Sequence, residues 1–142
     1  MPVDQQQPAM VAPATRGGCL CGGVRYEVRG ALRDVVACHC SQCRRTSGHF
    51  VAATQVPSAQ LQLTESATLR WYRSSAAAER GFCARCGGNL FWRETAPEST
   101  TTSIMAGTLE VPTGLRLSQH IFAGDKSDYY EITDGVPQRV QG

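Results

Sequence analysis

Hydrophobic and polar residues alternate along short stretches of this chain, a pattern typical of β-strands with one buried face. In residues 24–29, Val, Tyr and Val alternate with Arg, Glu and Arg. Gly-rich turns such as Gly22-Gly23 and Gly87-Gly88 separate many of the strand-length stretches. The pattern predicts a mainly β protein of several small antiparallel sheets. Further strands are predicted at Val35–Ala37, Phe50–Gln55, Leu61–Leu63, Leu69–Tyr72, Arg80–Phe82, Leu90–Trp92, Ser103–Ala106, Leu117–Phe122 and Tyr129–Ile132.

Only short helical turns are expected. The one candidate is Ser41–Thr46, with Ser41 as its N-terminal cap and Gly48 as its stop. Residues 1–15 are rich in Gln, Pro and Ala and show no periodicity, so we expect a mobile N-terminal tail. Residues 16–142 are then predicted to form a single domain.

Composition and charge exclude several classes of protein. The chain has 142 residues, 42% of them hydrophobic, which suits one compact core. Its net charge of +2 does not indicate a strongly basic nucleic-acid binder. No apolar run is long enough for a membrane helix, and the first 15 residues lack the basic start and apolar stretch of a secretory signal. We therefore expect a soluble, cytoplasmic protein without a membrane partner.

The seven cysteines are the most informative feature of the sequence. An odd number in a reducing compartment argues against a disulfide framework. All seven lie between Arg16 and Arg93, where eleven arginines face four acidic residues. The arginines are therefore placed to offset the charge of metal-bound thiolates. The cysteine clusters are Cys19-Leu20-Cys21, Cys38-His39-Cys40-Ser41-Gln42-Cys43 and Cys83-Ala84-Arg85-Cys86.

The third cluster, followed by Gly87-Gly88, has the spacing of a zinc knuckle, in which a tight turn brings two sulfurs to one ion. A redox dithiol is the competing interpretation, but that role usually lies at a helix start in an α/β unit, and strand-like residues flank this pair. A closed zinc site needs four ligands. Two of these are Cys83 and Cys86, and the compact pair Cys19 and Cys21 would complete a structural site.

Three cysteines, Cys38, Cys40 and Cys43, then remain for a second zinc ion, giving two Zn²⁺ per chain. Three thiolates and one open position are what a catalytic zinc requires. In the alternative, His39, His49 or His120 closes the site as a fourth ligand. His39 lies between two cysteines, so we expect its side chain to point away from the metal as a supporting or surface group.

At these residues the chain resembles the glutathione-dependent formaldehyde-activating enzyme family, whose domain is shared with the centromere protein V group. The resemblance is carried by Gly18–Tyr26, Cys38–Gly48 and Phe82–Gly87, and it continues through His120-Ile121-Phe122 to Pro137. It implies a zinc-bearing β-tent fold over the domain of residues 16–142. It also implies structural zinc at Cys19, Cys21, Cys83 and Cys86 and catalytic zinc at Cys38, Cys40 and Cys43, the division reached above from spacing.

The resemblance further implies a carbon–sulfur lyase that acts on the adduct of a small thiol, such as glutathione, and an aldehyde, such as formaldehyde. Arg44 and Arg45 could pair with the carboxylates of the thiol, although they could equally be a solvated surface pair. Trp71, Tyr72, Phe91 and Trp92 occur at strand spacing and are expected in the core. The alternative function is a non-catalytic zinc module that binds a small thiol, a protein or a nucleic acid.

Overall fold

A computed structural model describes residues 14–142 of the chain. The tail expected at residues 1–15 therefore lies outside the described residues except for its last two, and Thr15 already begins a strand. The order of elements is β2 (Thr15–Gly18), β3 (Arg25–Val28), β4 (Val35–Cys38), α1 (Ser41–Ser47), β5 (Val51–Pro57), η2 (Ser58–Gln60), β6 (Leu61–Glu65), β7 (Leu69–Arg73), β8 (Ala78–Cys83), β9 (Asn89–Glu94), β10 (Thr101–Met105), η3 (Ala106–Thr108), β11 (Leu117–Ile121) and η4 (Ala123–Asp125). The prediction of a mainly β protein with short helical turns is confirmed.

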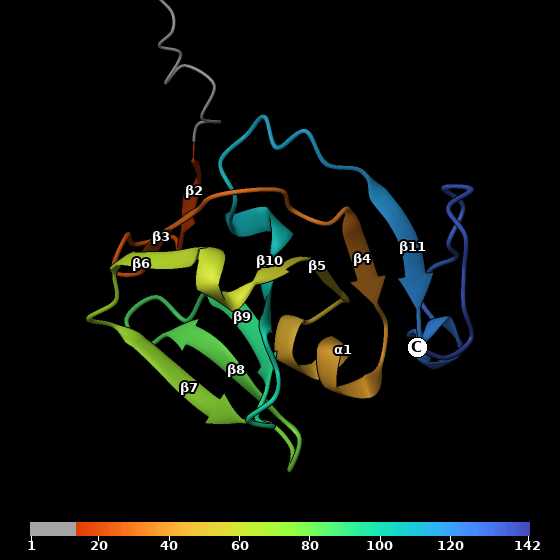
Figure 1. The fold of residues 1–142 in the computed structure, drawn as a ribbon. Coiled ribbons are helices and arrows are strands. Elements are labelled where there is room, and N and C mark those ends of the chain that lie inside the picture. Colours follow the sequence, from red (N-terminus) through yellow and green to blue (C-terminus); the bar gives the residue numbers. More distant parts are fainter. Residues whose placement is uncertain (1–13) are drawn as a thin grey trace, which may run out of the picture.

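Two sheets make up the fold (Figure 1). The larger has seven strands in the order β11-β4-β5-β10-β9-β8-β7, and the smaller has three in the order β2-β3-β6. Neighbouring strands run antiparallel except β11 and β4, which pair in parallel. This parallel pair places His120 beside Ala37 and Ile121 beside Cys38. A segment late in the chain is thereby joined to the strand that leads into the middle cysteine cluster.

The main core lies where side chains of the two sheets meet. Tyr26 of β3 is 1% exposed and meets Phe91 of β9 edge to face, with ring centroids 5.5 Å apart. Its hydroxyl lies 2.6 Å from Thr108 Oγ1, and Thr108 itself donates to the carbonyl of Met105. Tyr26 is therefore the donor to Thr108. Val24, Val28, Val56, Leu90, Ile104 and Leu109 complete the buried cluster together with Cys83.

The N-cap of helix α1 lies one residue earlier than the sequence predicted. Cys40 is the N-cap, and its sulfur accepts a hydrogen bond from the backbone N–H of Cys43. Ser41, the expected cap, is the first residue of the helix. Gly48 ends the helix with a φ of +86°, as predicted, because glycine adopts the left-handed conformation without strain.

The predicted strand at Tyr129–Ile132 is wrong, since this segment has no strand conformation. Alternation would send neighbouring side chains to opposite faces, but the rings of Tyr129 and Tyr130 both pack against His49. Of the helices within residues 14–142, none has the length and apolar character needed to cross a membrane.

Candidate metal centres

Four cysteines from two distant turns meet in one group. Cys19 and Cys21 come from the turn between β2 and β3, whereas Cys83 ends β8 and Cys86 lies in the turn that follows. The four sulfurs lie within 4.8 Å of one another. The structure thus brings together the residues that spacing assigned to a structural site.

The geometry of this four-cysteine group fits a tetrahedral zinc ion. The Sγ atoms of Cys19 and Cys21 are 3.7 Å apart, and those of Cys21 and Cys83 are 3.6 Å apart. Four zinc–sulfur bonds of about 2.3 Å at tetrahedral angles place sulfurs about 3.8 Å apart. All seven cysteines are free of disulfide bonds.

Hydrogen-bond donors surround the same sulfurs, as thiolates require. Backbone N–H groups of Val24 and Gly23 point at the sulfurs of Cys19 and Cys21. The hydroxyl of Thr68, 3.2 Å from the sulfur of Cys83, is the main cause that lowers the pKa of this thiol to about 5. Arg85 donates from Nε to the Cys21 sulfur at 3.3 Å and lowers the pKa of that thiol too. These donors favour the thiolate form of Cys21 and Cys83.

Cys38, Cys40 and Cys43 form the second group, again with sulfurs within 4.8 Å of one another. Cys38 ends β4, Cys40 caps α1 and Cys43 lies in the first turn of α1, so a strand end and a helix start converge on one point. No histidine belongs to this group within residues 14–142. The alternative in which a histidine closes the site as the fourth ligand is therefore not favoured.

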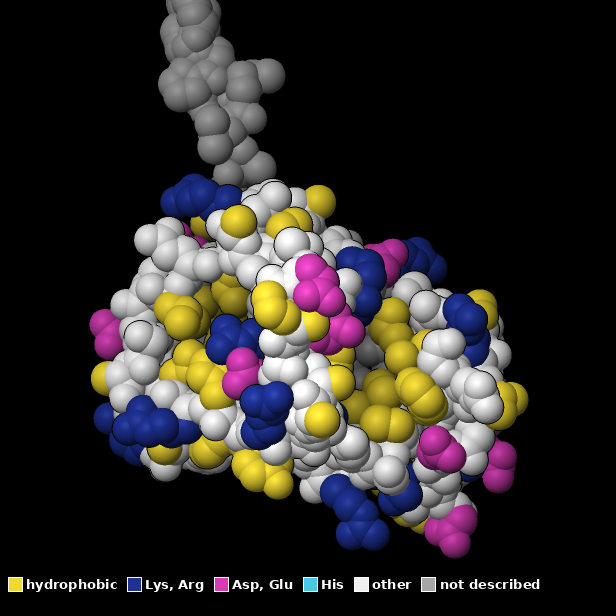
Figure 2. All heavy atoms as spheres, turned by 60° about the horizontal axis from the view of Figure 1, so that its bottom comes forward, with side chains coloured by type: hydrophobic (Ala, Val, Ile, Leu, Met, Phe, Trp, Pro, Cys, Tyr) yellow, Lys and Arg dark blue, Asp and Glu magenta, His cyan; other side chains and the backbone are white. Residues whose placement is uncertain are grey.

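A cavity of about 410 Å³ opens beside this cysteine triad. Its wall is mainly apolar and comes from six strands of the large sheet, with Val36, Val51, Trp92, Met105 and Ile121 among its apolar residues. The face turned forward in Figure 2 is hollowed, with hydrophobic side chains gathered in the hollows and charged side chains around them. All three cysteines of the triad line the cavity, so a small molecule within it can reach their sulfurs.

Two arginines that the sequence analysis did not single out also line this cavity. Arg80 of β8 is 8% exposed, and its Nη2 lies 4.0 Å from the sulfur of Cys43. The hydrogen bond from Cys38, helped by the charge of Arg80, lowers the pKa of Cys43 to about 6. Arg33, between β3 and β4, is exposed and donates from Nη2 to the carbonyl of Ala53.

The arginines and aromatic residues noted in the sequence lie differently from expectation. Arg44 and Arg45 are absent from the described lining of the cavity, and Arg44 Nε instead donates to the Asp125 carbonyl at 2.9 Å. Tyr72 is 62% exposed and so is not a core residue, because it lies on the edge strand β7. Trp92 lines the cavity, and Phe91 alone of the four is fully buried.

His39 turns away from the triad, as expected, but it is fully buried and not a surface residue. Its Nε2 lies 2.8 Å from His120 Nδ1, and its Nδ1 lies 2.8 Å from the Tyr130 hydroxyl. His120 Nε2 in turn lies 2.8 Å from a carboxylate oxygen of Asp134. Because a carboxylate only accepts, this chain of bonds has one consistent direction, in which Tyr130 donates to His39, His39 to His120 and His120 to Asp134.

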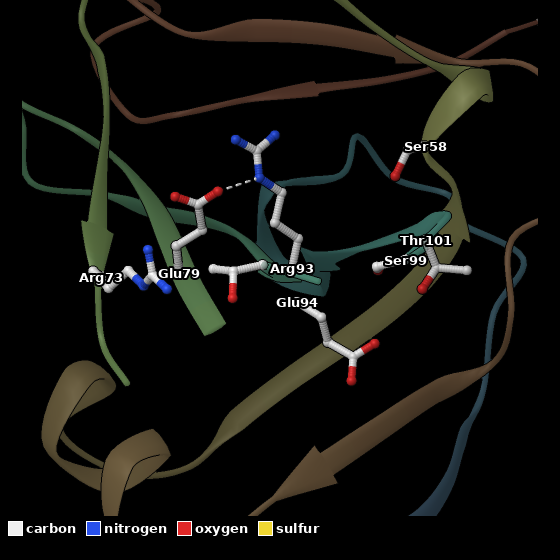
Figure 3. Close-up of a pocket in the computed structure, with 8 residues that line it drawn as sticks. Ser58, Arg73, Glu79, Arg93, Glu94, Ser99 and Thr101 are labelled. Atoms are coloured by element: carbon white, nitrogen blue, oxygen red, sulfur yellow. Dashed lines mark hydrogen bonds and ion pairs between the residues drawn. The ribbon is translucent and has the colours of Figure 1, made fainter. Parts of the chain in front are cut away.

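A second cavity, of about 460 Å³, holds no cysteine in its described lining. Figure 3 shows the ion pair that occupies it, in which Arg93 Nε lies 2.7 Å from a carboxylate oxygen of Glu79. The Arg93 guanidinium also lies 3.7 Å from the centroid of the Trp71 ring. Arg93 therefore has a carboxylate partner within the protein, which Arg80 lacks among the described residues.

Comparison with known proteins adds three findings. A family model described as glutathione-dependent formaldehyde-activating enzyme matches residues 14–125. A Schizosaccharomyces pombe protein named as an uncharacterized lyase is 29% identical over 125 residues, which cover 86% of this chain and 88% of that protein. A crystal structure of a Rhodobacter sphaeroides protein, 27% identical, matches with a TM-score of 0.57 over 68% of this chain and 88% of the other.

Proposed function

Because this chain belongs to the glutathione-dependent formaldehyde-activating enzyme family, we propose that it is a zinc-dependent carbon–sulfur lyase acting on the adduct of a thiol and an aldehyde. At the family level it is an enzyme of the lyase type. The carbon–sulfur bond, the zinc and the substrates are our proposal, with glutathione and formaldehyde as the pair that the family description suggests.

One observation carries the proposal: the triad of Cys38, Cys40 and Cys43 lines an open cavity, whereas the other cysteine group already has four sulfurs. Three protein ligands leave one position for a substrate, and four leave none. We therefore assign a catalytic role to the triad and a structural role to Cys19, Cys21, Cys83 and Cys86, with two Zn²⁺ per chain.

The reaction is an addition without oxidation or reduction. The thiol sulfur forms a bond to the aldehyde carbon, the π pair of the carbonyl moves to oxygen, and the thiol proton passes through water to that oxygen. Zinc held by three thiolates supplies a position that lowers the pKa of an incoming thiol and polarises a carbonyl.

The protein side chains position the reactants and compensate charge. The apolar wall of the cavity provides a surface of low polarity beside the triad, which strengthens electrostatic interactions there. Arg80 compensates the negative charge that the thiolates place at the base of the cavity, since its Nη2 faces Cys43. The hydrogen-bonded chain from Tyr130 to Asp134 holds His39, and thereby the backbone between Cys38 and Cys40, in one conformation.

The test measures both the metal content of the protein and the rate at which the thiol and the aldehyde interconvert with their adduct. Zinc analysis of the purified protein should give about two ions per chain, and NMR exchange spectroscopy should show faster interconversion of thiol, formaldehyde and hydroxymethyl thioether with protein than without. Cys40→Ser is the informative variant, because Ser still caps α1 while the sulfur is lost.

Cys40→Ser should abolish the acceleration and lower the metal content by about one ion, whereas Leu20→Ser, next to the other group and 93% exposed, should change neither. Thiol binding without acceleration would replace the lyase by a thiol-binding module. If no small thiol perturbs the triad, the proposed function is wrong.

A further inference from the structure

Apart from the cysteines of the triad, the charged side chains of the cavity beside it are all positive. Arg33 and Arg80 line it, and its described lining holds no Asp, Glu, Lys or His. The remaining lining is apolar or neutral. The thiolates of the triad are the only negative groups available there, and they are committed to the metal in the proposed function.

Arg80 has no carboxylate partner among the described residues. It forms no salt bridge among the described residues, and its Nε–H is buried without a hydrogen-bond acceptor. Its recorded contact is the long one, 4.0 Å, to Cys43 Sγ. Burying a guanidinium is costly unless its donors are paired, and Arg80 has donors beyond the one that faces Cys43, so it is suited to bind a further negative group in the cavity.

Arg33 provides a second positive charge at the exposed side of the same cavity. Its Nη2 and Nε donate to the carbonyls of Ala53 and Asp34, which fix the guanidinium in place without neutralising it. Arg93, in contrast, is neutralised by Glu79 in the other cavity (Figure 3). The cavity beside the triad is thus lined by two arginines and, among its described lining residues, by no carboxylate.

We propose, resting on the proposed function, that the thiol substrate is a mercapto-carboxylate: it has a carboxylate one or two carbons from the sulfur, an apolar substituent, and no ammonium group. The short spacing follows because Arg80 Nη2 lies 4.0 Å from the sulfur of Cys43, one of the three residues that would hold the zinc and, through it, the thiol. Val36, Val51, Trp92, Met105 and Ile121 offer the substituent an apolar surface.

Glutathione fits this cavity less well. Its ammonium group would face two arginines and no acidic side chain among the described lining residues. Both of its carboxylates are also separated from the sulfur by a peptide bond. The positive lining therefore favours a smaller thiol that carries a carboxylate and no ammonium group.

The experiment compares 2-mercapto-3-phenylpropionate with its primary amide and with glutathione. Binding is followed by the sulfur-to-metal charge-transfer band of cobalt-substituted protein and by calorimetry on the zinc protein. We expect the acid to bind about tenfold or more tightly than the amide, the difference expected of a charge-assisted pair, and more tightly than glutathione.

Arg80→Gln should reduce the acid-to-amide ratio to near one, and Arg70→Gln, an exposed arginine outside the cavity, should leave it unchanged. If Arg80→Gln does not fold, the acid and amide affinities of the unaltered protein decide the question. Equal binding of acid and amide, or tighter binding of glutathione, overturns this inference while leaving the lyase proposal intact. No response to any thiol overturns the lyase proposal itself.

Discussion

His39 Nε2 and His120 Nδ1 lie 2.8 Å apart, although 81 residues separate the two histidines in the chain. Both rings are buried, and burial lowers the pKa of His39, which keeps its ring neutral. With Asp134 as the terminal acceptor, His120 must carry its proton on Nε2 and accept on Nδ1. This pair ties the backbone between Cys38 and Cys40 to β11, and the bond from His120 to Asp134 extends the link to the segment after β11.

Replacing His120 should therefore destabilise the protein more than removing the hydroxyl of Tyr130 from the same chain of hydrogen bonds. His120→Phe leaves a buried N–H of His39 without an acceptor, at a cost of about 1–3 kcal/mol in the free energy of unfolding. Tyr130→Phe removes one hydrogen bond, the one to His39 Nδ1, whereas His120→Phe removes two, so Tyr130→Phe should cost less, about 1 kcal/mol. Urea unfolding of both variants measures the difference. If both variants lose the same free energy of unfolding, the hydrogen bond between the two histidines makes no additional contribution to stability.

Loss of one sulfur from the four-cysteine group should prevent stable folding. Cys83 is fully buried, and structural zinc contributes on the order of 10 kcal/mol to the stability of small metal-dependent folds. Cys83→Ser is expected to be insoluble or to unfold far below the melting temperature of the unaltered protein, while Leu20→Ser in the facing turn melts normally. A zinc-depleted Cys83→Ser protein with an unchanged melting temperature would refute the structural assignment.

A mild chelator should remove metal in two stages. The triad has three protein ligands and lines a cavity, so its ion exchanges more easily than one enclosed by four sulfurs. We expect about one zinc per chain to be released while the circular dichroism spectrum is unchanged, and the second only with unfolding. Release of both ions in a single step that coincides with unfolding would contradict the division of roles.

Stability should fall at high pH because of Tyr26. Burial raises the pKa of Tyr26 to about 12, whereas in the unfolded chain it is about 10. Between these values the unfolded state releases the phenol proton and the folded state keeps it. The free energy of unfolding therefore decreases as pH rises from 10 to 12, by about 2–3 kcal/mol in total.

Tyr26→Phe is the control for this pH dependence. It loses the hydrogen bond to Thr108 and should be less stable at neutral pH by about 1 kcal/mol, but its stability should decrease less between pH 10 and 12. Denaturant midpoints of the two proteins across this range provide the comparison. Parallel curves would assign the alkaline loss to other groups.

Local patterns predicted the strands and the cysteine groups because both depend on near neighbours in the sequence. Residues 24–29 alternate in exposure as their side chains alternate in polarity. The three cysteines of the triad lie within six consecutive residues, so one strand end and one helix start are enough to bring them together. The knuckle at Cys83 and Cys86 is equally local, and Cys19 and Cys21 were predicted as its complement because they form the other compact pair.

Long-range relationships could not be predicted in this way. Arg80 lies within a predicted strand, and nothing in its neighbourhood indicates that a charged side chain is buried beside Cys43. His39 had no identifiable partner, because His120 reaches it only through the parallel pairing of β11 with β4. The strand predicted at Tyr129–Ile132 is wrong because both tyrosines pack against His49, and local periodicity does not indicate that contact.

The two outer strands of the large sheet are protected against association in different ways. On β7, the side chains of Arg70 and Arg73 place positive charge along an edge that carries Trp71 and Tyr72. On β11, the backbone of residues 137–141 covers the edge instead, with His120 hydrogen-bonded to Pro137 and Arg139 and Phe122 to Gln141. A chain cut before Pro137 would expose unpaired backbone groups of β11, and with them a surface on which a second molecule could add a strand and begin to aggregate.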